Sequence, residues 1–118
     1  MPKGDDIEDR LIDFAVRIIK VSRATSRVPS GAHIANQILR SGTAPAAYYA
    51  EARGAESKND FIHKLKICLK ELNETRVWLK IIVRSEMLSE NRIQGILQES
   101  DELCRIINAS VKTAKTKK

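Results

Sequence analysis

The chain is poor in aromatic residues, at 4% of 118 positions, and no apolar run approaches the roughly 18 residues of a membrane span. Residues 1–6 also lack the apolar stretch of a secretory signal, so we expect a cytoplasmic protein. With 42% hydrophobic and 31% charged residues, the composition is closer to that of a helical bundle than to a disordered chain or an all-β sandwich. The length fits one domain with one core.

Cysteine is also scarce, with one residue at position 68 and one at position 104. Both fall on apolar positions of expected helices, where a free thiol behaves as a small hydrophobic group. A disulfide needs an oxidising compartment and a suitable approach of the two backbones. We therefore expect Cys68 and Cys104 to be buried and reduced.

Histidine occurs only twice, which leaves little material for a metal or catalytic site. Asp60 and His63 have the acid-x-x-His spacing of a di-iron carboxylate site, but that site needs two such pairs and further inward-facing glutamates. The other histidine, His33, has no acidic residue three positions before it. No nucleophile and base are brought together by an evident motif. We expect no catalytic residue, no metal and no cofactor, and hence no enzyme.

The net charge of +6 is unevenly distributed. Residues 57–84 carry seven basic and three acidic side chains, whereas residues 85–111 carry two basic and five acidic ones. Four lysines close to the C-terminus supply a further +4: Lys112, Lys115, Lys117 and Lys118. The basic character therefore belongs to one segment and the tail.

Apolar residues recur at helical spacing in four segments, with Ile7, Leu11, Phe14 and Ile18 as the first example. The expected helices cover about residues 5–26, 30–53, 57–84 and 89–111, between a flexible N-terminus (1–4) and a disordered Lys-rich tail (112–118). Ser57 and Asp60 form a capping-box start for the third. Short connections make neighbouring helices antiparallel. The sequence thus predicts an all-α, up-down-up-down four-helix bundle.

Pro45 falls inside the second expected helix, where it removes a backbone donor and crowds the carbonyl of Ser41. We expect a kink near Ser41 and Gly42. The residues around it are small, so a partner helix can approach closely there. A phosphate-binding loop is not favoured, because neither P-loop nor GxGxxG spacing is present.

The third expected helix has three distinct sectors when its residues are placed at about 100° intervals. A core stripe contains Phe61, Leu65, Cys68, Leu72, Thr75, Leu79 and Ile82. A basic sector contains Lys66, Lys70, Lys80 and Arg84, together with Asn73. A third sector contains Ile67, Glu71, Glu74, Trp78 and Ile81, together with Asp60.

The third sector combines a tryptophan, aliphatic residues and acidic groups away from the core stripe. Such a composition is typical of a subunit contact, in which aromatic side chains supply much of the binding energy. Alternatively, this helix touches two helices of its own bundle. On the first interpretation the subunit interface comprises Ile67, Glu71, Glu74, Trp78 and Ile81.

The basic sector is a candidate nucleic-acid interface, because cations spaced a turn or two apart suit a phosphate backbone. A solvated surface is the alternative, and the lack of interleaved aromatic residues argues against single-strand stacking. The candidate binding residues are Lys66, Lys70, Lys80, Arg84, Lys112, Lys115, Lys117 and Lys118.

Two blocks of sequence, residues 40–52 and residues 57–79, resemble the bacterial four-helix-bundle family of 23S ribosomal RNA intervening sequence proteins. The chain departs from the family pattern at Pro45 and Tyr48. The resemblance implies a ring-like homopentamer. It also implies similarity to the accessory variability protein of diversity-generating retroelements, a basic pentamer that binds nucleic acid and works with a reverse transcriptase.

Residues and resemblance together favour a non-enzymatic, self-assembling bundle that binds RNA, DNA or a nucleic-acid-processing protein, such as a reverse-transcriptase-like partner. The alternative is a purely structural or protein-interaction module without a nucleic-acid role. The two hypotheses differ in whether the basic sector has a ligand.

Overall fold

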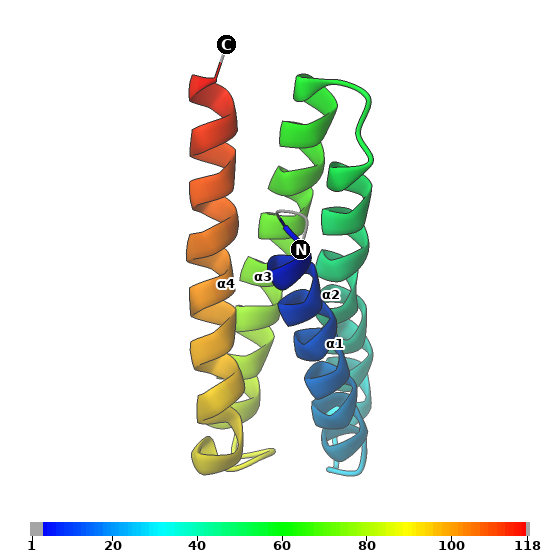
Figure 1. The fold of residues 1–118 in the computed structure, drawn as a ribbon. Coiled ribbons are helices and arrows are strands. Elements are labelled where there is room, and N and C mark those ends of the chain that lie inside the picture. Colours follow the sequence, from blue (N-terminus) through cyan, green and yellow to red (C-terminus); the bar gives the residue numbers. More distant parts are fainter. Residues whose placement is uncertain (1–3, 118) are drawn as a thin grey trace.

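The computed structural model describes residues 4–117, and this part of the chain forms four α-helices and no strands. They are α1 (Asp5–Ser26), α2 (Gly31–Arg53), α3 (Lys58–Arg84) and α4 (Glu90–Thr116). Successive helices run in opposite directions along a body of 51 × 24 × 21 Å (Figure 1). The predicted up-down-up-down bundle is therefore confirmed.

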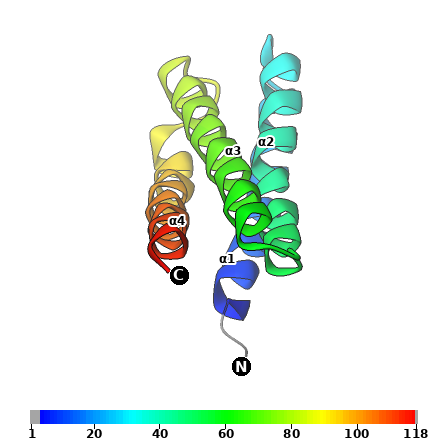
Figure 2. The ribbon, with the colours of Figure 1, turned by 90° about the horizontal axis from the view of Figure 1, so that it is seen from above.

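The helices are not equally close to one another. α2 packs along both α1 and α3, and α3 packs along α4, whereas α1 and α4 touch much less. Seen from above, α1 and α4 are the pair of neighbours that stand apart (Figure 2). Arg10 of α1 links them through Glu99 at 2.8 Å and Glu102 at 3.0 Å. Thus α2 and α3 form the centre of the bundle.

The last two helices begin where their capping residues predict. The Ser57 hydroxyl accepts a hydrogen bond from the Asp60 amide at 3.0 Å, and the Ser89 hydroxyl accepts one from the Arg92 amide at 3.3 Å. Each bond satisfies one of the amides that a helix N-terminus leaves without an intrahelical partner. None of the helices in the described part of the chain could serve as a membrane span.

The core consists of one apolar stripe from each helix, as the periodicity predicts. Of the stripe expected on α3, only Phe61 is partly exposed. Cys68 and Cys104 are both buried free thiols, as expected. The largest fully buried side chains include Phe14, Leu11, Ile18, Ile38, Leu65, Leu72, Leu79, Ile82, Ile93, Leu103 and Ile107.

Small residues in the middle of α2 allow both of its neighbours to approach closely. A methyl group added at Gly42 would lie 2.5 Å from Cγ2 of Ile18 on α1. On the other side, the hydroxyls of Thr75 on α3 and of Ser41 share a buried hydrogen bond of 2.9 Å. α2 continues through Pro45 without a break, and the expected bend stays a prediction.

The predicted disordered tail is wrong for residues 112–116, because α4 continues to Thr116. Ala114 is buried one turn after Val111, so the core stripe of α4 extends further than the lysines around it indicate. Lysine and alanine are also good helix formers. Lys117 caps the helix, and Lys118 lies outside the described residues.

The predicted flexible N-terminus also lies outside the described residues, except for Gly4. The Gly4 carbonyl accepts a hydrogen bond from the Glu8 amide at 3.0 Å. This bond joins Gly4 to the first turn of α1.

The close contact at Gly42 reverses the usual effect of replacing a helical glycine. Alanine normally stabilises a helix by about 0.5–1 kcal/mol relative to glycine, but overpacking a core costs about 1–3 kcal/mol. Gly42→Ala should therefore lower the free energy of unfolding measured with urea. Gly95→Ala on α4 should raise it, because the added methyl group would meet only the flexible end of Arg17, at 3.3 Å. Stabilisation by both substitutions would contradict the close packing of α1 on α2.

Candidate nucleic-acid interface

A polar pocket of about 520 Å³ opens along the outer seam between α3 and α4. Its cations are Arg76 and Lys80 from α3 and Arg105 from α4, and Asp101 is its only carboxylate. Arg76 donates a hydrogen bond from Nη1 to Asp101 at 3.3 Å. The remaining lining residues are Leu69, Asn73, Cys104 and Asn108.

Further along the same seam, Lys66 of α3 lies next to Lys115 of α4. The positive charge of Lys66 and the contact between the two ammonium groups lower the pKa of Lys115 below its usual value. Two adjacent cations attract a common anion more strongly than either does alone. The helical end of α4 therefore places a lysine of the predicted tail beside the basic sector of α3.

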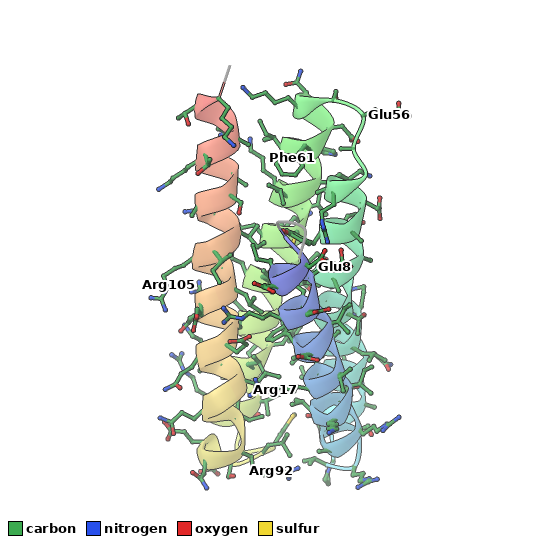
Figure 3. The ribbon with its side chains drawn as sticks, viewed as in Figure 1. Glu8, Arg17, Glu56, Phe61, Arg92 and Arg105 are labelled. Carbon is green, nitrogen blue, oxygen red and sulfur yellow. The ribbon has the colours of Figure 1, made fainter. Side chains whose placement is uncertain are left out.

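We use the name basic face for the cations of this seam and of the adjoining outer surface. The four lysine and arginine positions predicted on α3 are all exposed, and Arg105, Lys112 and Lys115 are exposed on α4. Figure 3 shows Arg105 pointing away from the bundle on the α4 side. The basic face comprises Lys66, Lys70, Arg76, Lys80, Arg84, Arg105, Lys112 and Lys115.

Two of these residues, Arg76 and Arg105, were absent from the sequence prediction. Arg76 falls between the core stripe and the basic sector of α3, and its role depends on α4 lying beside it. The register of α4 against α3 would have revealed both residues. Of the other predicted residues, Lys117 lies at the end of α4, where its carbonyl accepts a hydrogen bond from Lys58, and Lys118 lies outside the described part.

Most of the predicted subunit interface faces α2 of the same chain. Arg40 of α2 forms ion pairs with Glu71, at 3.2 Å, and with Glu74. Trp78 donates a hydrogen bond from Nε1 to Glu74 at 3.0 Å, and its ring meets His33 of α2 edge to face, at 6.3 Å between centroids. Contacts within one chain thus involve three of the five residues.

The two remaining interface candidates are aliphatic. Ile67 is partly buried, whereas Ile81 is 37% exposed and lies one turn after Val77, which is 52% exposed. The other exposed large aliphatic residues of the described part are Ile12 and Val16 on α1 and Leu39 on α2. Val77 and Ile81 therefore form the apolar part of the outer surface of α3.

The thiols are poorly suited to nucleophilic chemistry. Burial raises the pKa of Cys68 to about 12, and burial also raises the pKa of Cys104. Since the thiolate is the reactive form, both remain protonated near neutral pH. Among residues 4–117, no cluster of three or more histidine, cysteine, aspartate or glutamate side chains is arranged to hold a metal ion.

A larger and more apolar groove, of about 980 Å³, lies between the start of α1, the α2–α3 connection and the end of α4. In Figure 1 this is the end of the bundle where α2, α3 and α4 extend beyond the N-terminus of α1. Its lining includes Phe61 and Ile106, but Glu56 is its only carboxylate and it contains no histidine or cysteine.

The chain is similar to known proteins in both sequence and structure. A family model described as "23S rRNA-intervening sequence protein" matches residues 6–109. A protein of unknown function from the S23 ribosomal protein family of Bacteroides thetaiotaomicron has a known crystal structure and shares 36% sequence identity with this chain. The two structures superpose with a TM-score of 0.86. The similarity covers 90% of this chain and 98% of that one. No curated protein matches the sequence.

The contact between Lys66 and Lys115 can be tested through the titration of Lys115. Lys66→Gln removes the neighbouring charge and should raise the pKa of Lys115 towards its usual value, as measured by NMR of the lysine side chains. Lys80→Gln removes the same charge further along the basic face and should leave that pKa unchanged. If Lys66→Gln has no effect, the last turn of α4 does not lie against α3 in solution.

Proposed function

Because the chain belongs to the family of 23S rRNA-intervening sequence proteins, we propose that it is a self-associating, non-enzymatic bundle whose basic face binds RNA or DNA. The observation that carries the proposal is the gathering of eight cations on one face, around a pocket that contains only one carboxylate. A cytoplasmic location and a reverse-transcriptase-like partner remain predictions.

The dimensions of the basic face suit a nucleic-acid strand. Lys66 and Arg84 are 18 residues apart on α3, which corresponds to about 27 Å along the helix axis. A duplex rises about 3.4 Å per base pair, so this length matches roughly eight base pairs. The face has no aromatic residue, which favours contacts to phosphates over stacking with bases.

Reversal of four exposed charges tests this proposal directly. Replacing Lys66, Lys70, Lys80 and Arg84 together with glutamate should weaken the binding of a short RNA at least about 100-fold at low salt, as measured by fluorescence anisotropy. The slope of log affinity against log salt should also become shallower by about 3, because each lost phosphate contact removes 0.7–0.9 from it.

A matched control separates the basic face from net charge. Replacing Arg17, Lys20, Arg23 and Arg27 with glutamate changes the overall charge by the same amount, at exposed positions of α1 and the turn that follows it. This variant should retain most of the affinity. Equal loss in both variants, or no binding by the wild type at low salt, would reject the basic face and favour a structural or protein-interaction role.

The proposed self-association rests on the family resemblance and on the exposed aliphatic pair Val77 and Ile81. Leaving two large apolar side chains adjacent on a helix surface is unfavourable in water, and their burial against a second subunit removes that cost. Both residues lie on the exposed surface of α3, and Val77, seven residues from both Lys70 and Arg84, is in line with the basic face.

Light scattering tests the association and its location. At micromolar concentration the wild-type protein should have a mass several times that of the 13.3 kDa chain, and a pentamer would have five times that mass. Val77→Glu with Ile81→Glu should lower it, whereas Ile12→Glu with Val16→Glu, an equivalent change on α1, should not. A monomeric wild-type protein would contradict self-association. If only the α1 variant dissociates, the subunit contact lies on α1 and not at Val77 and Ile81.

A further inference from the structure

Arg76 has an unusual feature at the inner wall of the α3–α4 pocket. Among the side chains of residues 4–117, its Nε is the only buried nitrogen or oxygen atom without a hydrogen-bond partner. Buried polar groups are nearly always paired, because their desolvation is otherwise uncompensated. Arg76 Nε is therefore a donor beside this pocket that has no acceptor within the described residues.

The hydrogen bond between Arg76 and Asp101 leaves one particular edge of the guanidinium without a partner. A guanidinium group presents two forks to planar acceptors, one formed by its two terminal nitrogens and the other by Nε and Nη2. The Asp101 carboxylate accepts from Nη1. The Nε–Nη2 edge therefore remains, and its two parallel donors match two oxygens of a phosphate group.

Other groups of the pocket extend this donor set. Asn73 accepts a hydrogen bond through Oδ1 from the Cys104 thiol at 3.6 Å, which leaves its amide NH₂ as a donor. Lys80, Arg105 and Asn108 also line the pocket, so donors come from both helices. The volume of about 520 Å³ exceeds that of one phosphate group and admits an attached sugar.

The charge of the pocket narrows the ligand class further. Three cations and one carboxylate leave two positive charges. A phosphodiester within a strand carries one negative charge, whereas a phosphate monoester carries about 1.5 to 2 at neutral pH. A monoester therefore balances the pocket better than a phosphodiester does.

We propose that the α3–α4 pocket binds a phosphate monoester, held by the Nε–Nη2 edge of Arg76 with Lys80 and the two asparagine amides. Nε is shielded in the free protein, so a small rotation of the guanidinium accompanies binding. The inference deepens the proposed function, on which it rests for the source of the ligand, namely the terminal phosphate of a nucleic-acid strand. A free nucleotide offers the same chemistry.

NMR of the ¹⁵N-labelled protein tests the pocket itself. Inorganic phosphate and adenosine monophosphate should each shift the Arg76 Nε–H signal and the side-chain amide signals of Asn73 and Asn108. Arg76→Lys, which removes the fork but keeps the charge, should abolish the shifts of the two asparagines. Asn108→Asp provides a second test if Arg76→Lys fails to fold, because Asn108 is exposed. It should weaken phosphate binding at least about fivefold. Asn91→Asp, the same change on α4 outside the pocket, should leave phosphate binding unchanged.

Two RNA strands of identical sequence, one with a 5′-phosphate and one with a 5′-hydroxyl, identify the source. The phosphorylated strand should bind about tenfold more tightly, and Arg76→Lys should remove this difference. If adenosine monophosphate binds but the two strands bind equally, the ligand is a free nucleotide and the strand-end assignment is overturned. If phosphate shifts no signal of Arg76, Asn73 or Asn108, the assignment of the pocket as a phosphate site is overturned, whatever the RNA affinity. Failure of both strands to bind, with these shifts intact, rejects only the proposed nucleic-acid function.

Discussion

The packing of α2 between α1 and α3 is the constraint on which the rest of the bundle depends. Gly42 brings α1 close to one side of α2, and the hydrogen bond between Thr75 and Ser41 joins α3 to the other side. With both sides of α2 occupied, α4 packs along the free side of α3. Its contact with α1 is slight and includes the ion pairs of Arg10 with Glu99 and Glu102.

This arrangement explains why charges of opposite sign occupy different sides of α3. The side that faces α2 carries Glu71 and Glu74, which meet Arg40. Glu71 is buried, at 8% exposure, and a buried carboxylate is tolerated when it is paired with a cation. The side that faces α4 carries Arg76 and Lys80, whose only carboxylate neighbour in the pocket is Asp101. The acidic sector is thus partly neutralised by Arg40 within the chain, whereas the basic face retains a positive charge.

Features that depend on a single helix could be predicted from the sequence. The start of α3 follows from Ser57, and the core stripe of α3 follows from its period. The end of α4 was predicted wrongly, because the lysines after Val111 masked the continued spacing to Ala114. The origin of the Trp78 sector stayed open, because a helical wheel shows how many faces a helix has but not which neighbour covers each face. The Arg76 pocket requires the register between α3 and α4, which no local pattern contains.

The helical end of α4 also connects the fold to the proposed binding of anions. Lysines in the last turn stabilise a helix by interacting with its dipole. However, Lys115 lies beside Lys66, and the repulsion between their two positive charges opposes the packing of this turn against α3. An anion bound between the two ammonium groups would remove the repulsion, so part of its binding free energy would come from relief of an unfavourable contact. In the proposed homo-oligomer, symmetry would repeat the basic face on every subunit. A long nucleic-acid strand could then bind several faces at once, with a total affinity well above that of one modest site.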